Sequence, residues 1–243
     1  MERVPFVVGN DTVHVRSIIS GKPPVILVHG LGVSGDYYLK FAKELASHYD
    51  VYIIDLPGYG KTPKPKKPLT IVQLSDVLRQ YILASGITGS VIMGQSMGCQ
   101  IVAHTVVASP DLFKKVILLA PTVNNKERTV LAQGFRLFQD TFHESLATNL
   151  IVFVNYARMG VRRFLITSKF MVDDHIEDVV SNINVPTLFV TGARDKIVPK
   201  TWIDHLAAIT PTGHSAVLAN APHLLQQEKP AALLTMTRDF IES

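Results

Sequence analysis

The pentapeptide Gly94-Gln95-Ser96-Met97-Gly98 has the pattern G-x-S-x-G, which can present a serine as a nucleophile. It follows the apolar run Ser90–Met93 and precedes a helical pattern. A strand that turns directly into a helix strains the residue at the turn, and flanking glycines remove side chains that would collide there. Ser96 could instead simply cap the helix that begins near Met97, and the two roles are compatible. We expect Ser96 to be a nucleophile.

A serine hydroxyl needs a base that takes its proton, usually a histidine oriented by a carboxylate. Asp195 follows the apolar run Thr187–Val190, and His223 follows the next run, Ser215–Leu218. If both runs are parallel strands, both loops emerge at the sheet edge that carries Ser96. Neighbouring strands lie about 4.8 Å apart, so the two side chains can meet. The sequence therefore predicts a catalytic set of Ser96, His223 and Asp195.

Other polar clusters fit structural roles better. The segment 173–178 is acidic and contains His175, but it resembles a helix start enriched in acid, so we predict no metal site. The loop after the strand 116–119 carries asparagines where an alternative acid could stand, which favours Asp195. Cys99 is expected to be a buried packing residue, although a thiol so near Ser96 could be reactive. His48, His104 and His143 are interpreted as structural, and His214 precedes its strand, which places it at the sheet edge opposite Ser96.

The stretch HGLGVSG, His29 to Gly35, fits two different chemistries. From its first glycine it spells G-x-G-x-x-G, a dinucleotide-binding turn that would need Asp55 to hold a ribose. It can equally be an oxyanion loop, in which the main-chain N–H groups of Leu31 and Met97 await a developing negative charge. We favour the oxyanion loop, because the dinucleotide interpretation leaves the predicted catalytic set unexplained. His29 and Gly30 are then expected to contact substrate.

Alternating strand-like and helical patterns predict an α/β fold with a doubly wound, mostly parallel sheet. Strands are expected at 25–28, 51–54, 90–93, 116–119, 187–190 and 215–218, after an antiparallel hairpin at 3–8 and 12–19. Helices are expected around 37–47, 71–85, 97–109, 200–208 and 230–241.

Residues 121–184 break this rhythm, because no strand returns and three helical stretches follow one another, at 131–142, 149–166 and 173–183. We interpret 121–184 as a helical cap on a core domain formed by 1–120 and 185–243. An insertion of this kind lies where ligands bind in parallel sheets. Phe135 and Phe138 of the cap are expected to contact substrate.

Composition sets further bounds. The net charge of +4, from 24 Lys and Arg against 20 Asp and Glu, is too small to indicate nucleic-acid binding. The basic run Lys61–Lys67 contains two prolines, is followed by a third, and is interpreted as an extended solvated loop. A single cysteine and the lack of a signal-like or membrane-spanning apolar run predict a cytoplasmic protein without stable membrane insertion. We expect a monomer or homodimer.

The sequence resembles the α/β-hydrolase family over essentially its whole length. The matching motifs are HGLG at 29–32, DLPGYGKT at 55–62, GQSMG at 94–98, TGARDKIVP at 191–199 and APHLLQQEKP at 221–230. Gln95 and Cys99 depart from the residues common in the family. The resemblance implies the Ser96–His223–Asp195 triad, the oxyanion hole at Leu31 and Met97, and a cap over the pocket.

Serine at position 96 excludes the dehalogenases and epoxide hydrolases that share this overall pattern, since these use aspartate there. The resemblance implies a serine hydrolase that cleaves small to medium carboxylic esters or thioesters through an acyl-enzyme, with no cofactor. Alternatives on the same triad are C–C bond hydrolysis of a diketone acid, in which cap arginines would hold the carboxylate, and lactonase or hydroxynitrile lyase-like activity. A catalytically silent receptor would normally have a damaged triad.

Overall fold

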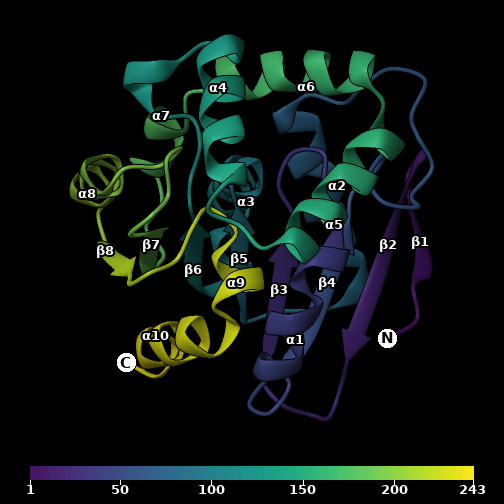
Figure 1. Ribbon diagram of the computed structural model, residues 1–243. Coiled ribbons are helices and arrows are strands. Elements are labelled where there is room, and N and C mark those ends of the chain that lie inside the picture. The colour runs from purple at the N-terminus through teal and green to yellow at the C-terminus, as the bar shows by residue number, and fades with distance from the viewer.

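The computed structural model describes all 243 residues and contains one eight-stranded sheet in the order β1-β2-β4-β3-β5-β6-β7-β8 (Figure 1). β1 and β2 form an antiparallel hairpin, and β2 pairs antiparallel with β4. The strands from β3 to β8 are mutually parallel. Their bounds are β1 Val4–Val8, β2 Asp11–Ile18, β3 Pro24–Val28, β4 Asp50–Asp55, β5 Ser90–Gln95, β6 Phe113–Leu119, β7 Thr187–Gly192 and β8 Gly213–Leu218.

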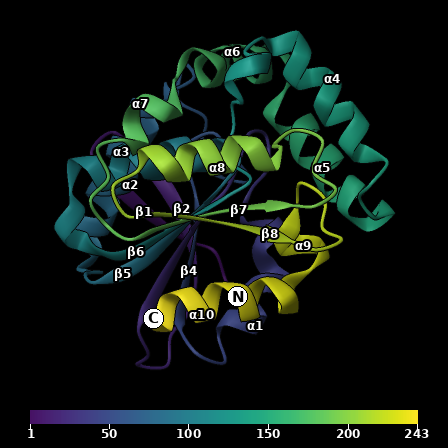
Figure 2. The same ribbon diagram turned by 90° about the vertical axis from the view of Figure 1, so that its left-hand side faces the viewer.

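Helices cover both faces of this sheet, as the apolar central strands require. Figure 2 shows α2, α3 and α8 on one face and α1 with α10 on the other. A short helix, α9, follows β8. The helices of this core are α1 Leu39–Leu45, α2 Ile71–Ser85, α3 Met97–Ala108, α8 Lys200–Ile209, α9 Leu225–Glu228 and α10 Pro230–Glu242. The predicted α/β class is therefore confirmed, and α9 is the one core helix that the sequence pattern did not predict.

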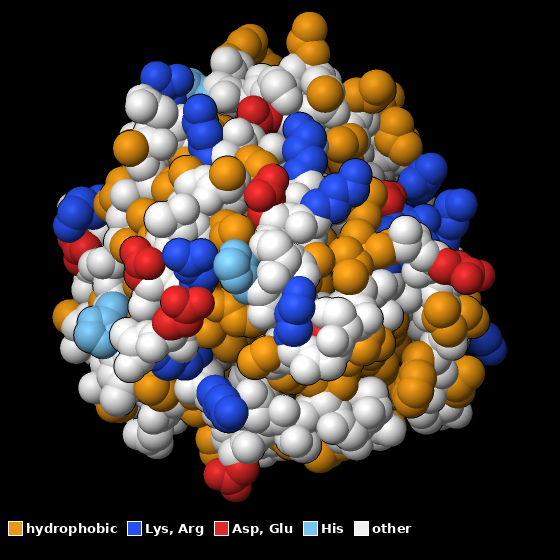
Figure 3. All heavy atoms as spheres, turned by 90° about the horizontal axis from the view of Figure 1, so that it is seen from below, with side chains coloured by type: hydrophobic (Ala, Val, Ile, Leu, Met, Phe, Trp, Pro, Cys, Tyr) orange, Lys and Arg blue, Asp and Glu red, His pale blue; other side chains and the backbone are white.

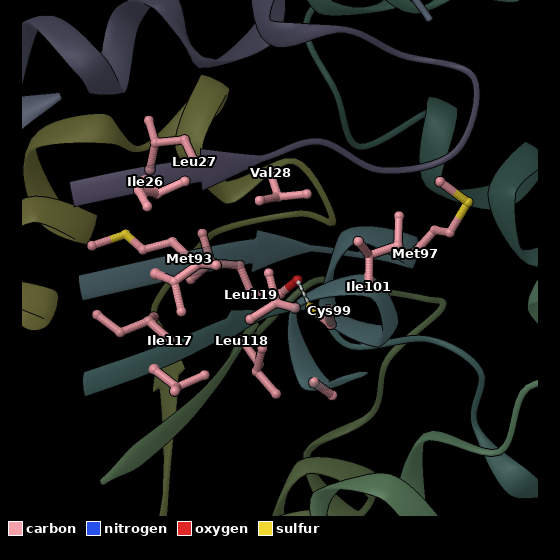
Figure 4. Packing of buried hydrophobic residues seen from close by; sticks show 14 of the residues in the cluster. Ile26, Leu27, Val28, Met93, Met97, Cys99, Ile101, Ile117, Leu118 and Leu119 are labelled. Atoms are coloured by element: carbon pink, nitrogen blue, oxygen red, sulfur yellow. Dashed lines mark hydrogen bonds between the residues drawn. The ribbon is translucent and has the colours of Figure 1, made fainter. Parts of the chain in front are cut away.

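The centre of the core lies between β3, β5, β6 and α3 (Figure 4). Cys99 is fully buried there and its thiol donates to the carbonyl oxygens of Gly94 and Leu119, at 3.3 Å each. Burial raises the pKa of this thiol well above its usual range. Since the thiolate is the reactive form, Cys99 is a packing residue rather than a reactive thiol.

Residues between β6 and β7 contain helices and no strand. These are α4 Val130–Thr141, α5 Leu146–Met159, α6 Val161–Asp173 and α7 Ile176–Val180. They lie over the carboxyl ends of the strands (Figure 1). The sequence pattern predicted one continuous helix across 149–166, but Gly160 divides it into α5 and α6, because its φ of +84° is incompatible with a helix.

No helix in the molecule combines the length and the apolar character that crossing a lipid bilayer requires.

Candidate active site

Ser96 occupies the sharp turn between β5 and α3. Its φ of 55° and ψ of −124° lie in a region that residues with side chains rarely adopt. The flanking glycines are sterically required. A Cβ at Gly94 would lie 2.4 Å from the carbonyl oxygen of Gly98, and one at Gly98 would lie 2.5 Å from that of Val28. The turn therefore holds Ser96 at the carboxyl edge of the sheet.

Asp195 and His223 meet beside this turn, on the loops after β7 and β8. The Nδ1 atom of His223 lies 2.9 Å from Oδ2 of Asp195, and both side chains are buried. The other carboxylate oxygen, Oδ1, accepts the N–H groups of Ile197 at 2.7 Å and Val198 at 2.9 Å. These two amides fix the orientation of the carboxylate toward the imidazole.

Ser96 and His223 line the same cavity. The hydrogen-bond contact of the Ser96 hydroxyl in this structure is with Thr122 Oγ1, at 3.5 Å, and not with His223. The pairing of Nδ1 with Asp195 leaves Nε2 of His223 available for a partner on the cavity side. Contacts between a nucleophile and its base are often long in ligand-free enzymes and shorten in the substrate complex.

The oxyanion loop after β3 packs directly against Ser96. A Cβ at Gly30 would lie 3.1 Å from the Cβ of Ser96, so only glycine permits this approach. The main-chain amides of Leu31 and Met97 donate no hydrogen bond to another protein group. Leu31 lines the cavity, and Met97 is the first residue of α3, where N–H groups point outward along the helix axis.

A buried network that the sequence pattern did not reveal connects these loops. The amide of Gly30 donates to the Tyr37 hydroxyl at 2.9 Å, and this hydroxyl donates to Oε1 of Gln95 at 3.0 Å. The side-chain amide of Gln95 donates in turn to the carbonyl oxygen of His223 at 3.2 Å. Gln95, which appeared only as a departure from the family pattern, therefore couples the oxyanion loop, the serine turn and the histidine loop.

A second acid from the cap also reaches the histidine loop. Asp140, near the end of α4, is 1% exposed and accepts the main-chain N–H of His223 at 3.1 Å through Oδ2. Its Oδ1 lies 3.4 Å from the N–H of Lys196, next to Asp195. Glu144 follows on the same segment and lines the cavity. The sequence contains little indication of this role for Asp140, because a single acid in an amphipathic helix normally faces water.

These carboxylates set the electrostatics of the site. Burial disfavours the charged imidazolium, but the negative charges of Asp195, Asp140 and Glu144 outweigh it and raise the pKa of His223 to about 9. Burial, together with the charge of Asp140, raises the pKa of Glu144 to about 8. Burial also raises the pKa of Asp140, against the opposing effect of His223. The cavity environment therefore favours the protonated form of Glu144.

The cavity has a volume of about 560 Å³ and lies between the strand ends and the cap. Its wall is mainly apolar and contains no lysine or arginine. Among the residues expected to contact substrate, Gly30 and Phe138 line the cavity. The expectation was wrong for Phe135, which is 59% exposed on the outer side of α4.

His29 does not line the cavity either, because its ring points into the core. It is fully buried, its Nδ1 contacts the carbonyl oxygen of Gly30 at 2.9 Å, and its Nε2 accepts the N–H of Leu56 at 3.1 Å. Burial lowers its pKa, so the ring is neutral. His29 therefore supports the loop after β3 from the core side and does not line the cavity.

The alternative sites considered from the sequence have structural partners. Asp55 is 1% exposed and accepts the N–H of Gly35 at 2.5 Å, so it cannot reach a ribose. In the acidic segment 173–178, Asp174 pairs with His104 and Glu177 with Arg128. No group of three or more potential metal-ligating side chains comes together.

Comparison with known proteins identifies the family of the chain. The family described as alpha/beta hydrolase fold matches residues 23–155, more than half of the chain. A pimeloyl-[acyl-carrier protein] methyl ester esterase of Aeromonas salmonicida is 25% identical, with 90% of this chain and 95% of that protein covered. A putative carbamate hydrolase of Enterobacter cloacae is 23% identical, with 92% of each chain covered.

Solved structures show the same fold. A thermophilic esterase from Thermogutta terrifontis superposes with a TM-score of 0.82 at 20% identity, covering 100% of this chain and 98% of that one. A bacterial membrane phospholipase A gives a TM-score of 0.85 at 19% identity, covering 99% of this chain and 86% of that one. From the family match, the fold and the esterase relatives together, the chain belongs to the α/β-hydrolase family and is a hydrolase.

Proposed function

We propose that the protein is a serine hydrolase of neutral carboxylic esters with an apolar acyl group. The observation that carries the proposal is the placement of Ser96 on a strained turn, at one wall of a cavity whose neighbouring wall holds the Asp195–His223 pair. The esterase relatives support ester cleavage as the reaction class.

In the proposed mechanism, Nε2 of His223 takes the proton of the Ser96 hydroxyl as its oxygen attacks the ester carbonyl carbon. The main-chain amides of Leu31 and Met97 donate to the oxyanion of the tetrahedral intermediate, and such donors each contribute about 3–4 kcal/mol in other hydrolases. His223 then protonates the leaving alcohol. Water, activated by the same imidazole, hydrolyses the acyl-enzyme and releases Ser96.

The cavity wall supports an uncharged substrate. It has no Lys or Arg to bind a substrate carboxylate, and its only acid, Glu144, would repel one when ionised. Such a wall gives no support to hydrolysis of a diketone acid, which needs a cation for the carboxylate. The arginines expected to serve this purpose lie elsewhere: Arg136 pairs with Glu127, and Arg163 donates to the carbonyl oxygen of Pro65.

A fluorophosphonate probe tests the assignment of the nucleophile. The probe phosphonylates an activated serine, and peptide mass spectrometry locates the modified residue. We expect the label on Ser96 in the wild-type protein and no label in Ser96→Ala. A label on another serine, or equal hydrolysis of p-nitrophenyl butyrate by Ser96→Ala, would overturn the proposal.

A series of p-nitrophenyl esters with increasing acyl length then measures the cavity. We expect kcat/KM to rise with chain length until the acyl group fills the apolar wall, and then to fall. The matched control is Ser168→Ala, because Ser168 also lines the cavity but donates to a carbonyl oxygen within its own helix. This variant should keep both activity and probe labelling.

A further inference from the structure

The cap carries a large apolar surface that no other part of the chain covers. On α4 and the residue that ends it, four side chains recur at helical spacing and therefore share one face. They are 59–87% exposed: Leu131, Phe135, Phe138 and Phe142. Monomeric proteins rarely expose contiguous apolar patches of this kind without a binding role.

The patch continues onto α5, where Leu146, Leu150 and Phe153 are 63–88% exposed and follow the same spacing. Together with the four side chains of α4, we call this surface the cap stripe. α4 and α5 lie at the outer edge of the cap (Figure 2). Phe138 and Phe153 belong both to the stripe and to the cavity wall, so the stripe adjoins the active-site cavity.

A basic surface lies at the end of α5, the helix that carries part of the cap stripe. Lys64 Nζ donates to the carbonyl oxygen of Arg158 at 2.5 Å, and Arg163 donates to that of Pro65 at 2.6 Å, so the lysine-rich loop packs against the α5–α6 junction. The basic rim consists of six exposed side chains, with no exposed acid in either segment: Lys61, Lys64, Lys66, Lys67, Arg158 and Arg162. The face opposite the cap differs, because its basic and acidic side chains are interspersed (Figure 3).

We propose that the cap stripe and the basic rim dock the enzyme on the surface of an anionic lipid membrane, with the active-site cavity facing the lipid. Amphipathic helices with aromatic and leucine side chains on one face and flanking basic residues bind membranes in this way, without crossing them. Each basic residue near an anionic surface adds to the attraction. The substrates delivered to Ser96 would then be esters that partition into the membrane.

The charge of the basic rim favours a lipid membrane over a second copy of the chain as the partner of the cap stripe. A two-fold pairing through the cap stripe would bring two basic rims close together and would close both cavities. An anionic lipid surface instead complements the rim, and the boundary between its headgroups and acyl chains can bury the stripe.

Vesicle sedimentation tests the docking with Ser96→Ala protein, so that the result does not depend on the proposed catalysis. Ser96→Ala protein with an unaltered cap stripe and basic rim should bind vesicles of phosphatidylcholine mixed with phosphatidylglycerol. It should bind vesicles of pure phosphatidylcholine more weakly. The triple variant Leu131→Ser, Phe142→Ser and Leu146→Ser should weaken binding at least ~10-fold on both. None of these three residues lines the cavity, so hydrolysis of a soluble short ester in the otherwise wild-type enzyme should be unchanged.

Two matched variants complete the test. Lys66→Gln with Lys67→Gln should weaken binding only to the anionic vesicles and reduce its salt dependence. Ile19→Ser with Val72→Ser removes exposed apolar side chains away from the cap and should change nothing. The proposal is overturned if the wild type does not bind either vesicle, or if light scattering shows a dimer that only the triple variant abolishes. Equal binding by the triple variant and the wild type would also overturn it.

Discussion

Replacement of Asp140 by alanine removes a carboxylate that connects α4 to the loops of Asp195 and His223. Its Oδ2 accepts the His223 N–H at 3.1 Å, whereas the Lys196 N–H at 3.4 Å is near the limit of a hydrogen bond. A buried N–H left without an acceptor costs about 1–3 kcal/mol. Removing a buried carboxylate also relieves its own desolvation, so we expect a net loss of about 2 kcal/mol.

In a chain of this size, that loss corresponds to a fall in Tm of roughly 4–8 °C. Urea unfolding followed by the fluorescence of Trp202 measures it directly, because this is the single tryptophan and it is buried. Asp173→Asn is the matched control, since Asp173 is an exposed acid of the same cap whose partner is Lys169. The control should stay within about 0.5 kcal/mol of the wild type.

The isosteric variant Asp140→Asn separates charge from packing. It keeps one acceptor oxygen but removes a negative charge that raises the pKa of His223. The proposed mechanism needs the neutral imidazole, so kcat/KM rises with pH as His223 loses its proton. The acid limb of the pH profile should therefore move to lower pH in Asp140→Asn, while Tm falls less than in Asp140→Ala. An unmoved acid limb together with wild-type stability in Asp140→Ala would refute the reasoning.

Three further predictions concern residues around the site. The pKa of Glu144 is about 8 in the folded protein and near 4.5 in the unfolded chain, so the folded state loses stability as pH rises between these values. Glu144→Gln should therefore raise Tm at pH 8 more than at pH 5, as measured by differential scanning fluorimetry. Gly30→Ala would place a Cβ 2.9 Å from Gln95 Oε1 and should reduce kcat by at least ~10-fold, whereas Gly134→Ala in α4, with open space around its Cβ, should retain activity and gain about 0.5–1 kcal/mol in stability. Tyr37→Phe leaves the Gly30 N–H without its acceptor and should cost about 1–3 kcal/mol in urea unfolding; an unchanged midpoint would show that water replaces the hydroxyl.

The sheet could be predicted closely because each strand has its own local signal. The six predicted parallel strands lie within β3 to β8, and the α2 bounds of 71–85 agree with the prediction. The predictions failed at positions where contacts with distant residues, and not the local sequence pattern, decide the conformation. The cap helix predicted across 149–166 contains a single glycine, whose helical or left-handed conformation is not decided locally. His29 follows the strand directly, and only packing decided that its ring faces Leu56 rather than the cavity.

By itself, the sequence determined the α/β class, the serine turn and the placement of Ser96, Asp195 and His223 on loops at one sheet edge. These features depend on chain direction and on steric rules that act within a few residues. Only the tertiary structure decided that Asp140, 83 residues before His223, accepts its N–H, and that the cavity wall lacks a cation. The physical reason is that α4 is apolar on two sides, so its pattern specifies burial but not which side faces the cavity and which forms the cap stripe.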